Sequence, residues 1–317
     1  MEQKIDSLIG DARRIVILGH VRPDGDCVGS CLGLKNYLLD QNPDLDIQVY
    51  LEEFPKEYMF LKGAEEICHD FFEEQTYDLC FVLDCGDRGR LGDAARYMDA
   101  AGRRICIDHH ITNEGVCEIN IVDPHSSSTA ELLITGMETE KISLAAAECL
   151  YLGIVHDTGV FKHSNTTRRT MQLAGEMLAK GVSSSHIIDD TFYKKTFVQN
   201  RILGCALLKA ELSLEGRMIS CILTQEDMAE YGACGMDLDG IIDQLRVTEG
   251  VEMAVLMHEN TDGSFKISMR SNDLVNVSSI AKEFGGGGHV KAAGASIPGD
   301  PEHFLEILKK KAAAQLG

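Results

Sequence analysis

The amino-acid sequence lacks any apolar run that approaches the roughly 20 residues of a membrane-spanning helix. Its first residues, Met1 to Gly10, include acids and a lysine but no apolar signal-peptide core. Hydrophobic residues make up 44% of the chain and charged residues 25%, which is ordinary for a soluble globular protein. These features argue against an integral membrane protein, and we expect a cytoplasmic protein with no membrane partner.

Basic residues are scarce. The chain has 30 lysines and arginines against 50 aspartates and glutamates, a formal net charge of −20. A protein that tracks a long nucleic acid usually carries a basic stripe, because its affinity comes from neutralising phosphates. Basic clusters here are short, as at Lys309–Lys311. The charge balance therefore argues against binding of long duplex nucleic acid and says little against a small anion held by metal ions.

The eleven cysteines include no CxxC pair, and the nearest approach is Cys27 and Cys31 with three residues between them. Several others lie inside apolar segments, where a free thiol behaves as a small buried hydrophobe. An odd number of cysteines without an export signal indicates a reducing compartment. We interpret them as structural thiols rather than as disulfides or metal ligands.

The chain of 317 residues is long for one domain and comfortable for two. In its first half, short apolar runs alternate with amphipathic stretches, a pattern typical of βα units and a parallel sheet. The fold class predicted for this half is α/β, a parallel sheet flanked by helices, with Asp26 at the N-terminal end of the first helix. Strands are predicted over residues 13–20, 46–51, 78–84, 103–108 and 117–122, and helices over 27–39, 129–137, 143–155 and 167–180.

The last third of the chain has a different pattern and predicts a second, smaller α/β domain. Its strands are expected over 217–223, 251–257 and 265–269, the last after the turn signal Asp262-Gly263. Helices are expected over 275–284 and 302–315. The predicted organisation is a first domain over residues 1–186, a helical connector over 187–208 and a second domain over 209–317.

Carboxylates and histidines recur in the first half at points where predicted strands or helices end. Ligands of open α/β sheets bind outside the carboxyl ends of the strands. One aspartate after a strand is usually only a turn or cap residue. Several such groups are harder to explain in that way, and we interpret them together as one site. They are His20, Asp24 and Asp26 after the first strand, Asp84 after the third, Asp108, His109 and His110 after the fourth, and His156 and Asp157 after a helix.

These residue types predict a pair of divalent ions. Oxygen ligands with a few imidazoles and no thiolates favour Mn²⁺ or Mg²⁺ over structural zinc. Two such ions roughly 3.5–4 Å apart can polarise a phosphoryl group and generate hydroxide. An aspartate that bridged both ions would hold that spacing, and the helix beginning near Asp26 could add its N-terminal dipole to an anion site.

Taken in order, these motifs resemble the DHH/DHHA1 phosphoesterases, and in particular their NrnA-like branch. Members of that branch act on short oligoribonucleotides (nanoRNA), on 3′-phosphoadenosine 5′-phosphate and in some cases on linear or cyclic dinucleotides such as cyclic di-AMP. The resemblance covers nearly the whole chain. The matching motifs are Gly19-His20, Asp24-Gly25-Asp26, Leu83-Asp84, Asp108-His109-His110 and His156-Asp157-Thr158-Gly159, then Gly285-Gly286-Gly287-Gly288-His289 and Ala292-Ala293-Gly294 in the last third.

The resemblance implies a role for each motif residue and a homodimer as one reasonable assembly. Asp84 would bridge two manganese ions, Asp108 would orient a neighbouring imidazole, and His110 would contact the scissile phosphate. A hydroxide activated by the ions would attack the phosphoester in line. The resemblance implies His20, Asp24 and Asp84 as ligands of one ion, and Asp26, Asp84, His109 and Asp157 as ligands of the other.

The glycine run of the last third predicts a phosphate-binding segment. Glycines leave backbone amides free to approach an anion, although a flexible turn explains such a run equally well without its histidine. The resemblance implies that the second domain binds substrate. The residues it implies are Arg270, Gly286, Gly287, Gly288 and His289.

Three other functions compete with a phosphoesterase for small nucleotides. A manganese pyrophosphatase would share the first motifs but not the glycine–histidine signature. A processive single-strand exonuclease resembling RecJ fits the chain length and the −20 charge less well. A nucleotide-binding sensor without catalysis is disfavoured because every expected ligand is present.

Overall fold

The computed structural model describes residues 4–72 and 74–317. The chain forms two compact units, which divide between Lys194 and Lys195. This division lies inside the segment expected as a connector, whose helix is not continuous. α7 (Ser184–Ile188) runs into a π-helical turn, Asp189–Tyr193, and α8 (Phe197–Lys209) begins anew after Thr196, whose side chain accepts a hydrogen bond from Gln199 N. The prediction of one helix over 187–208 is therefore wrong, because the backbone is extended at Lys194 and Thr196.

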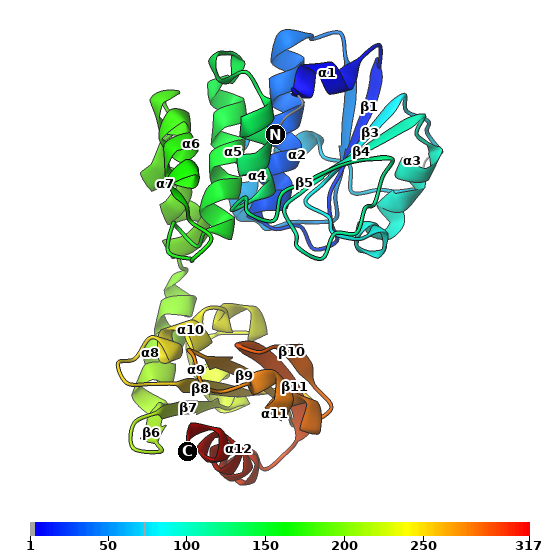
Figure 1. Ribbon diagram of the computed structural model, residues 1–317. Coiled ribbons are helices and arrows are strands. Elements are labelled where there is room, and N and C mark those ends of the chain that lie inside the picture. The colour runs from blue at the N-terminus through cyan, green and yellow to red at the C-terminus, as the bar shows by residue number, and fades with distance from the viewer. Residues whose placement is uncertain (1–3, 73) are drawn as a thin grey trace. The chain divides into compact units, whose positions relative to one another are not determined.

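The first unit is built on a parallel sheet, as the sequence predicts (Figure 1). The strand order is β2-β1-β3-β4-β5. Both faces of the sheet are covered, which is the arrangement that continuous apolar strands favour. The strands are β1 (Arg14–Leu18), β2 (Asp46–Tyr50), β3 (Leu79–Leu83), β4 (Arg103–Asp108) and β5 (Ile119–Val122). The α-helices are α1 (Ile5–Ile9), α2 (Gly25–Gln41), α3 (Ala95–Ala100), α4 (Thr129–Gly136), α5 (Leu144–Asp157), α6 (Arg168–Ala179) and α7.

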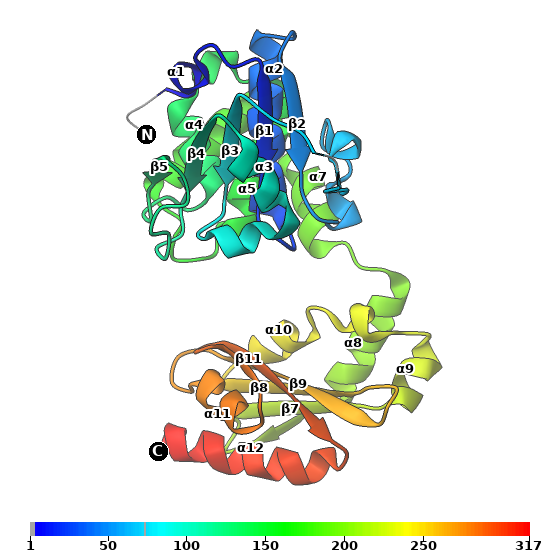
Figure 2. The ribbon, with the colours of Figure 1, turned by 90° about the vertical axis from the view of Figure 1, so that its right-hand side faces the viewer.

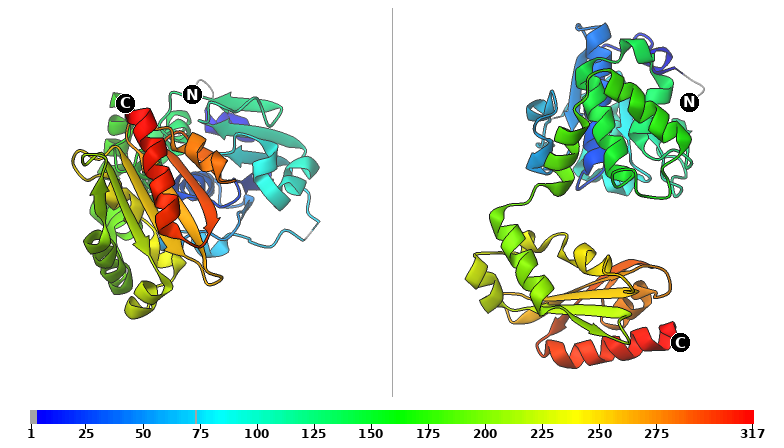
Figure 3. Two further views of the ribbon diagram at one scale, coloured as in Figure 1. Left: turned by 90° about the horizontal axis from the view of Figure 1, so that it is seen from below. Right: turned by 90° about the vertical axis from the view of Figure 1, so that its left-hand side faces the viewer.

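Alternate side chains of β1 point to opposite sides of the sheet and pack into two different layers of the core. Ile15 and Ile17 pack with α2, α4 and α5, whereas Val16 and Leu18 pack with the layer that includes α3. Figure 3 (right) shows the helical layer on the first side. Within residues 4–72 and 74–317, no helix is long and apolar enough to cross a membrane.

Helices α2 and α5 pack closely because glycines face the contact. A Cβ atom added to Gly29 would lie 2.4 Å from the Cys149 carbonyl oxygen, and one added to Gly153 would lie 2.5 Å from Asp26 Oδ1. This close approach brings the C-terminal end of α5, with Asp157, beside the first turn of α2, with Asp26.

Substitution of Gly29 by alanine should destabilise the protein by about 1–3 kcal/mol, because the added methyl group forces α2 away from α5. Urea unfolding followed by circular dichroism would measure the change. Gly175→Ala is the matched control, since this helical glycine has open space around it. We expect the control to be neutral or slightly stabilising, and equal losses in both variants would contradict the packing argument.

The second unit contains a mixed sheet with the order β10-β11-β9-β8-β7-β6 (Figure 2). Its strands are antiparallel except for the β7–β8 pair. The strands are β6 (Glu211–Ser213), β7 (Met218–Leu223), β8 (Met253–Glu259), β9 (Ser264–Ser271), β10 (Gly287–His289) and β11 (Ala292–Pro298). The α-helices are α8, α9 (Gln225–Tyr231), α10 (Ile241–Arg246), α11 (Val277–Glu283) and α12 (Pro301–Leu316).

The two faces of this sheet are covered to different extents. Helices α11 and α12 pack on one face against residues such as Met257 and Met269, and α12 lies along the sheet in Figure 3 (left). Helices α8, α9 and α10 pack on the opposite face against Ile219, Ala254 and Leu256 of β7 and β8. On that second face, the side chains of β9, β10 and β11 remain half-buried or exposed.

The glycine run forms part of the sheet rather than only a loop. Strand β10 pairs with β11, so that Gly287 lies opposite Gly294 and Gly288 opposite Ala293. A Cβ atom on Gly286 would lie 2.1 Å from the Gly294 carbonyl oxygen, and Gly288 has a φ of 139°. Close backbone approach thus requires glycine at both positions for structural reasons, whatever these residues bind.

Candidate metal centre

The predicted site residues of the first unit follow the carboxyl ends of its strands. His20 lies two residues beyond β1, Asp84 directly follows β3, and Asp108 ends β4. The first helix begins earlier than predicted, because Asp24 caps α2 and its carboxylate accepts hydrogen bonds from the amides of Asp26 and Cys27. Asp84 has a φ of 54°, a left-handed conformation that aspartate tolerates better than most side chains.

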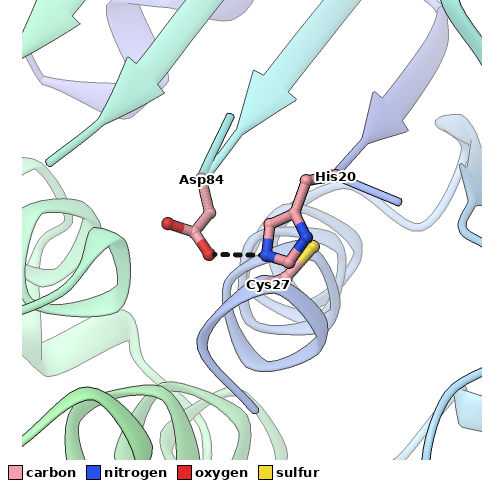
Figure 4. A group of neighbouring side chains, drawn as sticks. All are labelled: His20, Cys27 and Asp84. Carbon is pink, nitrogen blue, oxygen red and sulfur yellow. Dashed lines mark ion pairs between the residues drawn. The ribbon is translucent and has the colours of Figure 1, made fainter. Parts of the chain in front are cut away.

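The two carboxylate oxygens of Asp84 face two different groups of donors. On one side, Asp84 Oδ2 lies 3.4 Å from His20 Nε2 (Figure 4). That nitrogen lies 3.8 Å from Asp24 Oδ1. On the other side, Asp84 Oδ1 lies 3.5 Å from His109 Nε2, which lies 3.0 Å from Asp157 Oδ2. An aspartate placed between two sets of imidazole and carboxylate donors has the geometry of a bridging ligand.

The remaining predicted ligand, Asp26, completes the second group. A carboxylate oxygen of Asp26 and ligand atoms of His109 and Asp157 all lie within 4.8 Å of one another. The backbone of the next residue orients the ring of His20. The Nδ1 atom of His20 lies 2.9 Å from the carbonyl oxygen of Val21 and can donate to it. The lone pair of Nε2 is then directed to the carboxylates, as metal-binding histidines require. The donor set therefore fits two divalent cations.

The N-terminus of α4 holds two of these carboxylates in place. Asp26 is fully buried and accepts hydrogen bonds from the amides of Thr129 at 2.7 Å and Ala130 at 3.0 Å. The hydroxyl of Thr129 donates to Asp84 Oδ1 at 3.1 Å. The sequence left the role of Thr129 open, because helix capping explains the segment Ser126–Thr129 as well as a place in the active site does.

Replacing Thr129 with valine should lower kcat roughly 10- to 100-fold, because the hydrogen bond that orients Asp84 is lost at constant side-chain shape. Thr129→Ser keeps the hydroxyl and should retain most of the activity. Steady-state kinetics on an RNA dinucleotide, with thermal melting as a folding check, would test this. A valine variant as active as the serine variant would show that this hydrogen bond does not position Asp84.

The electrostatics of the site favour cations. Burial, together with the carboxylates of Asp84 and Asp157, raises the pKa of Asp26. Burial alone would lower the pKa of His109, but its hydrogen bond with Asp157 and the charges of Asp26 and Asp84 raise it to about 10. The imidazole therefore holds a proton that balances part of the clustered negative charge. A divalent cation can replace such protons, because a histidine ligand must be neutral.

Asp108 and His110 form a separate hydrogen-bonded pair beside the two donor groups. His110 Nδ1–H donates to Asp108 Oδ1 at 2.7 Å. The side-chain amide nitrogen of Asn113, Nδ2, donates to Asp108 Oδ2 at 2.7 Å. Asp108 is fully buried, and although burial alone would raise its pKa, these hydrogen bonds lower it. The pair fixes the tautomer of His110, so that Nε2 remains free to contact another group.

Two further residues near the donors were given no ligand role from the sequence. Cys27 lies against His20 and Asp84, as Figure 4 shows. Burial raises the pKa of its thiol well above the ordinary value, which keeps the thiol protonated unless a metal ion displaces the proton. His156 adds a third imidazole, which lies within 4.8 Å of ligand atoms of Asp24 and Asp157. Its ring occupies the space in which a side chain at Gly25 would otherwise lie.

The predicted substrate-binding residues lie in the second unit and share one face of its sheet. In the register of the strands, Arg270 of β9 lies opposite Ala292 of β11, which lies opposite His289 of β10. Directly opposite residues point to the same side of a sheet. Arg270 is half-buried, with its Nε 3.6 Å from Asp243 Oδ1, whereas His289 is exposed. The small side chain of Ala292 therefore lies between an arginine and a histidine that face the same way.

Each of the two units matches a known family domain. Residues 14–154 match the N-terminal domain of the DHH family, and residues 220–315 match the DHHA1 domain. The bifunctional oligoribonuclease and PAP phosphatase NrnA of Thermus thermophilus is 30% identical over 288 residues, which cover 90% of this chain and 84% of the relative. The cyclic-di-AMP phosphodiesterase GdpP of Geobacillus thermodenitrificans is 26% identical over 92% of this chain but only 45% of its own length.

A solved structure extends the comparison to the fold. The exopolyphosphatase-related protein of Bacteroides fragilis superposes with a TM-score of 0.83 and 27% sequence identity, over 96% of this chain and 93% of its own. The shared fold and the two domain matches agree with the motifs and with the clustered donors at the sheet edge. The chain therefore belongs to the DHH/DHHA1 family of metal-dependent phosphoesterases and is similar to its NrnA-like members.

Proposed function

We propose that this protein is a dimanganese phosphoesterase that hydrolyses short oligoribonucleotides, linear or cyclic dinucleotides, or 3′-phosphoadenosine 5′-phosphate. The observation that carries the proposal is the position of Asp84, whose two oxygens face separate donor groups. His20, Asp24 and Asp84 would hold one ion. The second would be held by Asp26, Asp84, His109 and Asp157.

Bound Mn²⁺, or Mg²⁺ in its place, would supply Lewis-acid polarisation of the phosphoester and an activated water nucleophile. The protein residues would orient the ligands, stabilise the developing charge and bind the substrate. His110, held by Asp108, presents Nε2 to a phosphate oxygen and stabilises the charge that develops as the ester oxygen leaves. Thr129 keeps Asp84 in its orientation. In the second unit, Arg270, the segment Gly286–Gly288 and His289 would bind a further part of the substrate.

The size of the substrate is inferred from charge and from the relatives. The net charge of −20 does not suit a protein that tracks a long polymer. The relatives named above are an oligoribonuclease and PAP phosphatase and a cyclic-di-AMP phosphodiesterase. These observations favour a small nucleotide over a RecJ-like exonuclease activity. The glycine–histidine segment within the DHHA1 match disfavours a pyrophosphatase. A homodimer is the assembly that we propose from the family.

Hydrolysis of a matched panel in Mn²⁺ tests the proposal. The panel contains a 5′-phosphorylated RNA dinucleotide, a pentanucleotide, a long single strand, cyclic di-AMP, 3′-phosphoadenosine 5′-phosphate and pyrophosphate. We expect rapid loss of the small nucleotides, and a raised KM in Arg270→Gln and His289→Ala. Arg88→Gln is the control, because this exposed arginine pairs with Asp99 at the surface. A preference for pyrophosphate or the long strand would contradict the proposed substrate class, and no turnover at all would favour a sensor.

A further inference from the structure

His156 is an imidazole beside the two donor groups that the proposed two-metal centre does not use. It lies in the last turn of α5, directly before Asp157. Its Nδ1 atom is buried and has no hydrogen-bond partner among residues 4–72 and 74–317. Buried polar atoms nearly always have a partner, and an unpaired ring nitrogen beside a cluster of carboxylates points to a bound cation.

The two carboxylate oxygens of Asp157 face two different histidines. Asp157 Oδ2 lies 3.0 Å from His109 Nε2, within the group that would hold the second ion. Asp157 Oδ1 lies 3.7 Å from His156 Nδ1, which is too long for a hydrogen bond. Two ligand atoms that are each about 2.1 Å from one divalent ion lie roughly 3–4 Å apart. The separation of Asp157 from His156 therefore suits two ligands of one cation.

Asp24 supplies the third donor of this group. A carboxylate oxygen of Asp24, a ring nitrogen of His156 and a carboxylate oxygen of Asp157 all lie within 4.8 Å of one another. An ionised carboxylate offers two oxygens with about four lone-pair sites, so each aspartate can serve this group and one of the other two ions. All three side chains are only half-buried, which leaves further coordination positions open to solvent.

The ring of His156 is held in place by two aromatic side chains and a glycine. The Tyr58 ring packs at 90° to it, with 6.4 Å between the ring centroids, and the centroid of the Phe192 ring lies 5.7 Å away. A Cβ atom added to Gly25 would lie 2.7 Å from Cγ of His156, so the glycine leaves the space that the ring occupies. A ligand that is already held in place loses little conformational freedom when it binds an ion.

We propose that His156, Asp24 and Asp157 form a third divalent-cation site, for Mn²⁺ or Mg²⁺, at the rim of the two-metal centre. The inference rests on the proposed function, since it adds an ion to that centre. One imidazole nitrogen and two carboxylate oxygens, without a thiolate, favour such ions. Three protein ligands leave positions for water or for a phosphate oxygen of the substrate. Two ions would already balance the four aspartates of the donor groups, so the third should bind more weakly.

Manganese titration followed by electron paramagnetic resonance tests the site, because the signal of free Mn²⁺ gives the number of ions bound. The wild-type protein should bind three ions, the third with a Kd roughly tenfold or more above those of the other two. His156→Phe keeps an aromatic ring against Gly25 but offers no ligand, and it should bind two. His156→Asn places an amide oxygen near the position of Nδ1 and should retain a third ion with reduced affinity.

His303→Phe is the matched control, because His303 is exposed on α12 of the second unit. This variant should bind as many ions as the wild-type protein. Thermal melting would show that each variant folds, and His156→Leu, which also lacks a ligand, serves if phenylalanine destabilises the fold.

The number of bound ions and the magnetic coupling of the manganese pair report on different sites. Equal numbers of ions in the wild-type protein and in both ligand-free variants would overturn the third site, while a coupled pair and hydrolysis would leave the proposed function intact. Loss of the coupled pair in His156→Phe would also overturn it, because His156 would then belong to the two-metal centre. A wild-type protein without a coupled pair would contradict the proposed function, yet one ion lost only on substitution of His156 would still support the site.

Discussion

Asp84→Asn should lower kcat roughly a thousandfold, on the scale of losing an electrostatic group at a reacting centre. Asparagine has the shape of aspartate but offers one ligand oxygen instead of two. The two oxygens of Asp84 face His20 and His109, so the variant should lose the bridge between the two donor groups. Hydrolysis of an RNA dinucleotide in Mn²⁺ would measure the loss. Electron paramagnetic resonance would show whether the magnetic coupling of two manganese ions disappears with it.

The matched control is Asp87→Asn, three residues further along the chain. Asp87 is exposed and caps the following turn, where its side chain accepts a hydrogen bond from Gly89 N. Asparagine also caps helical turns, so this variant should keep nearly all activity and both ions. If Asp84→Asn retained coupled manganese and turnover, the bridging role and the mechanism that depends on it would be wrong.

Glu131→Ala should lower the free energy of unfolding by about 2–4 kcal/mol, because buried hydrogen-bond donors lose their acceptor. The Glu131 side chain is fully buried on α4, where it accepts hydrogen bonds from Ser127 Oγ and Thr170 Oγ1 at 2.6 Å each. It also pairs with Arg169 of α6. The carboxylate thus joins α4, α6 and the segment that precedes α4, and alanine would remove the acceptor of the buried Ser127 hydroxyl and one acceptor each of Thr170 and Arg169.

Urea unfolding followed by circular dichroism would test this, with Glu138→Ala as the control. Glu138 is exposed and pairs with Lys141, a type of ion pair that contributes at most about 1 kcal/mol. Because Thr129 lies two residues before Glu131, we also expect Glu131→Ala to weaken manganese binding. Similar stability losses in the two variants would mean that the buried network is not a major contribution.

Much of the first unit could be predicted from its sequence, because its strands are short apolar runs that are buried on both faces. Such runs are visible in a single sequence, and the carboxyl ends of parallel strands must meet at one edge of the sheet. The clustering of the three motifs that follow strands results from this rule, whereas Asp157 lies at the end of α5 and is brought to the site by helix packing. Prediction was poorer in the second unit, where α9, α10, β10 and β11 were missed. The last two strands consist largely of glycine and alanine, which give no alternating apolar signal.

The sequence by itself determined which chemical groups are present and in what order: the carboxylates, the imidazoles and the glycine–histidine segment. Only the tertiary structure decided that the two oxygens of Asp84 face different donors, and that Thr129 contacts Asp26 from more than a hundred residues away. It also decided that Arg270 and His289 share a sheet face and that a cavity lies beside Arg270. The physical reason is that these contacts depend on strand register and side-chain packing between distant segments, which local periodicity does not encode.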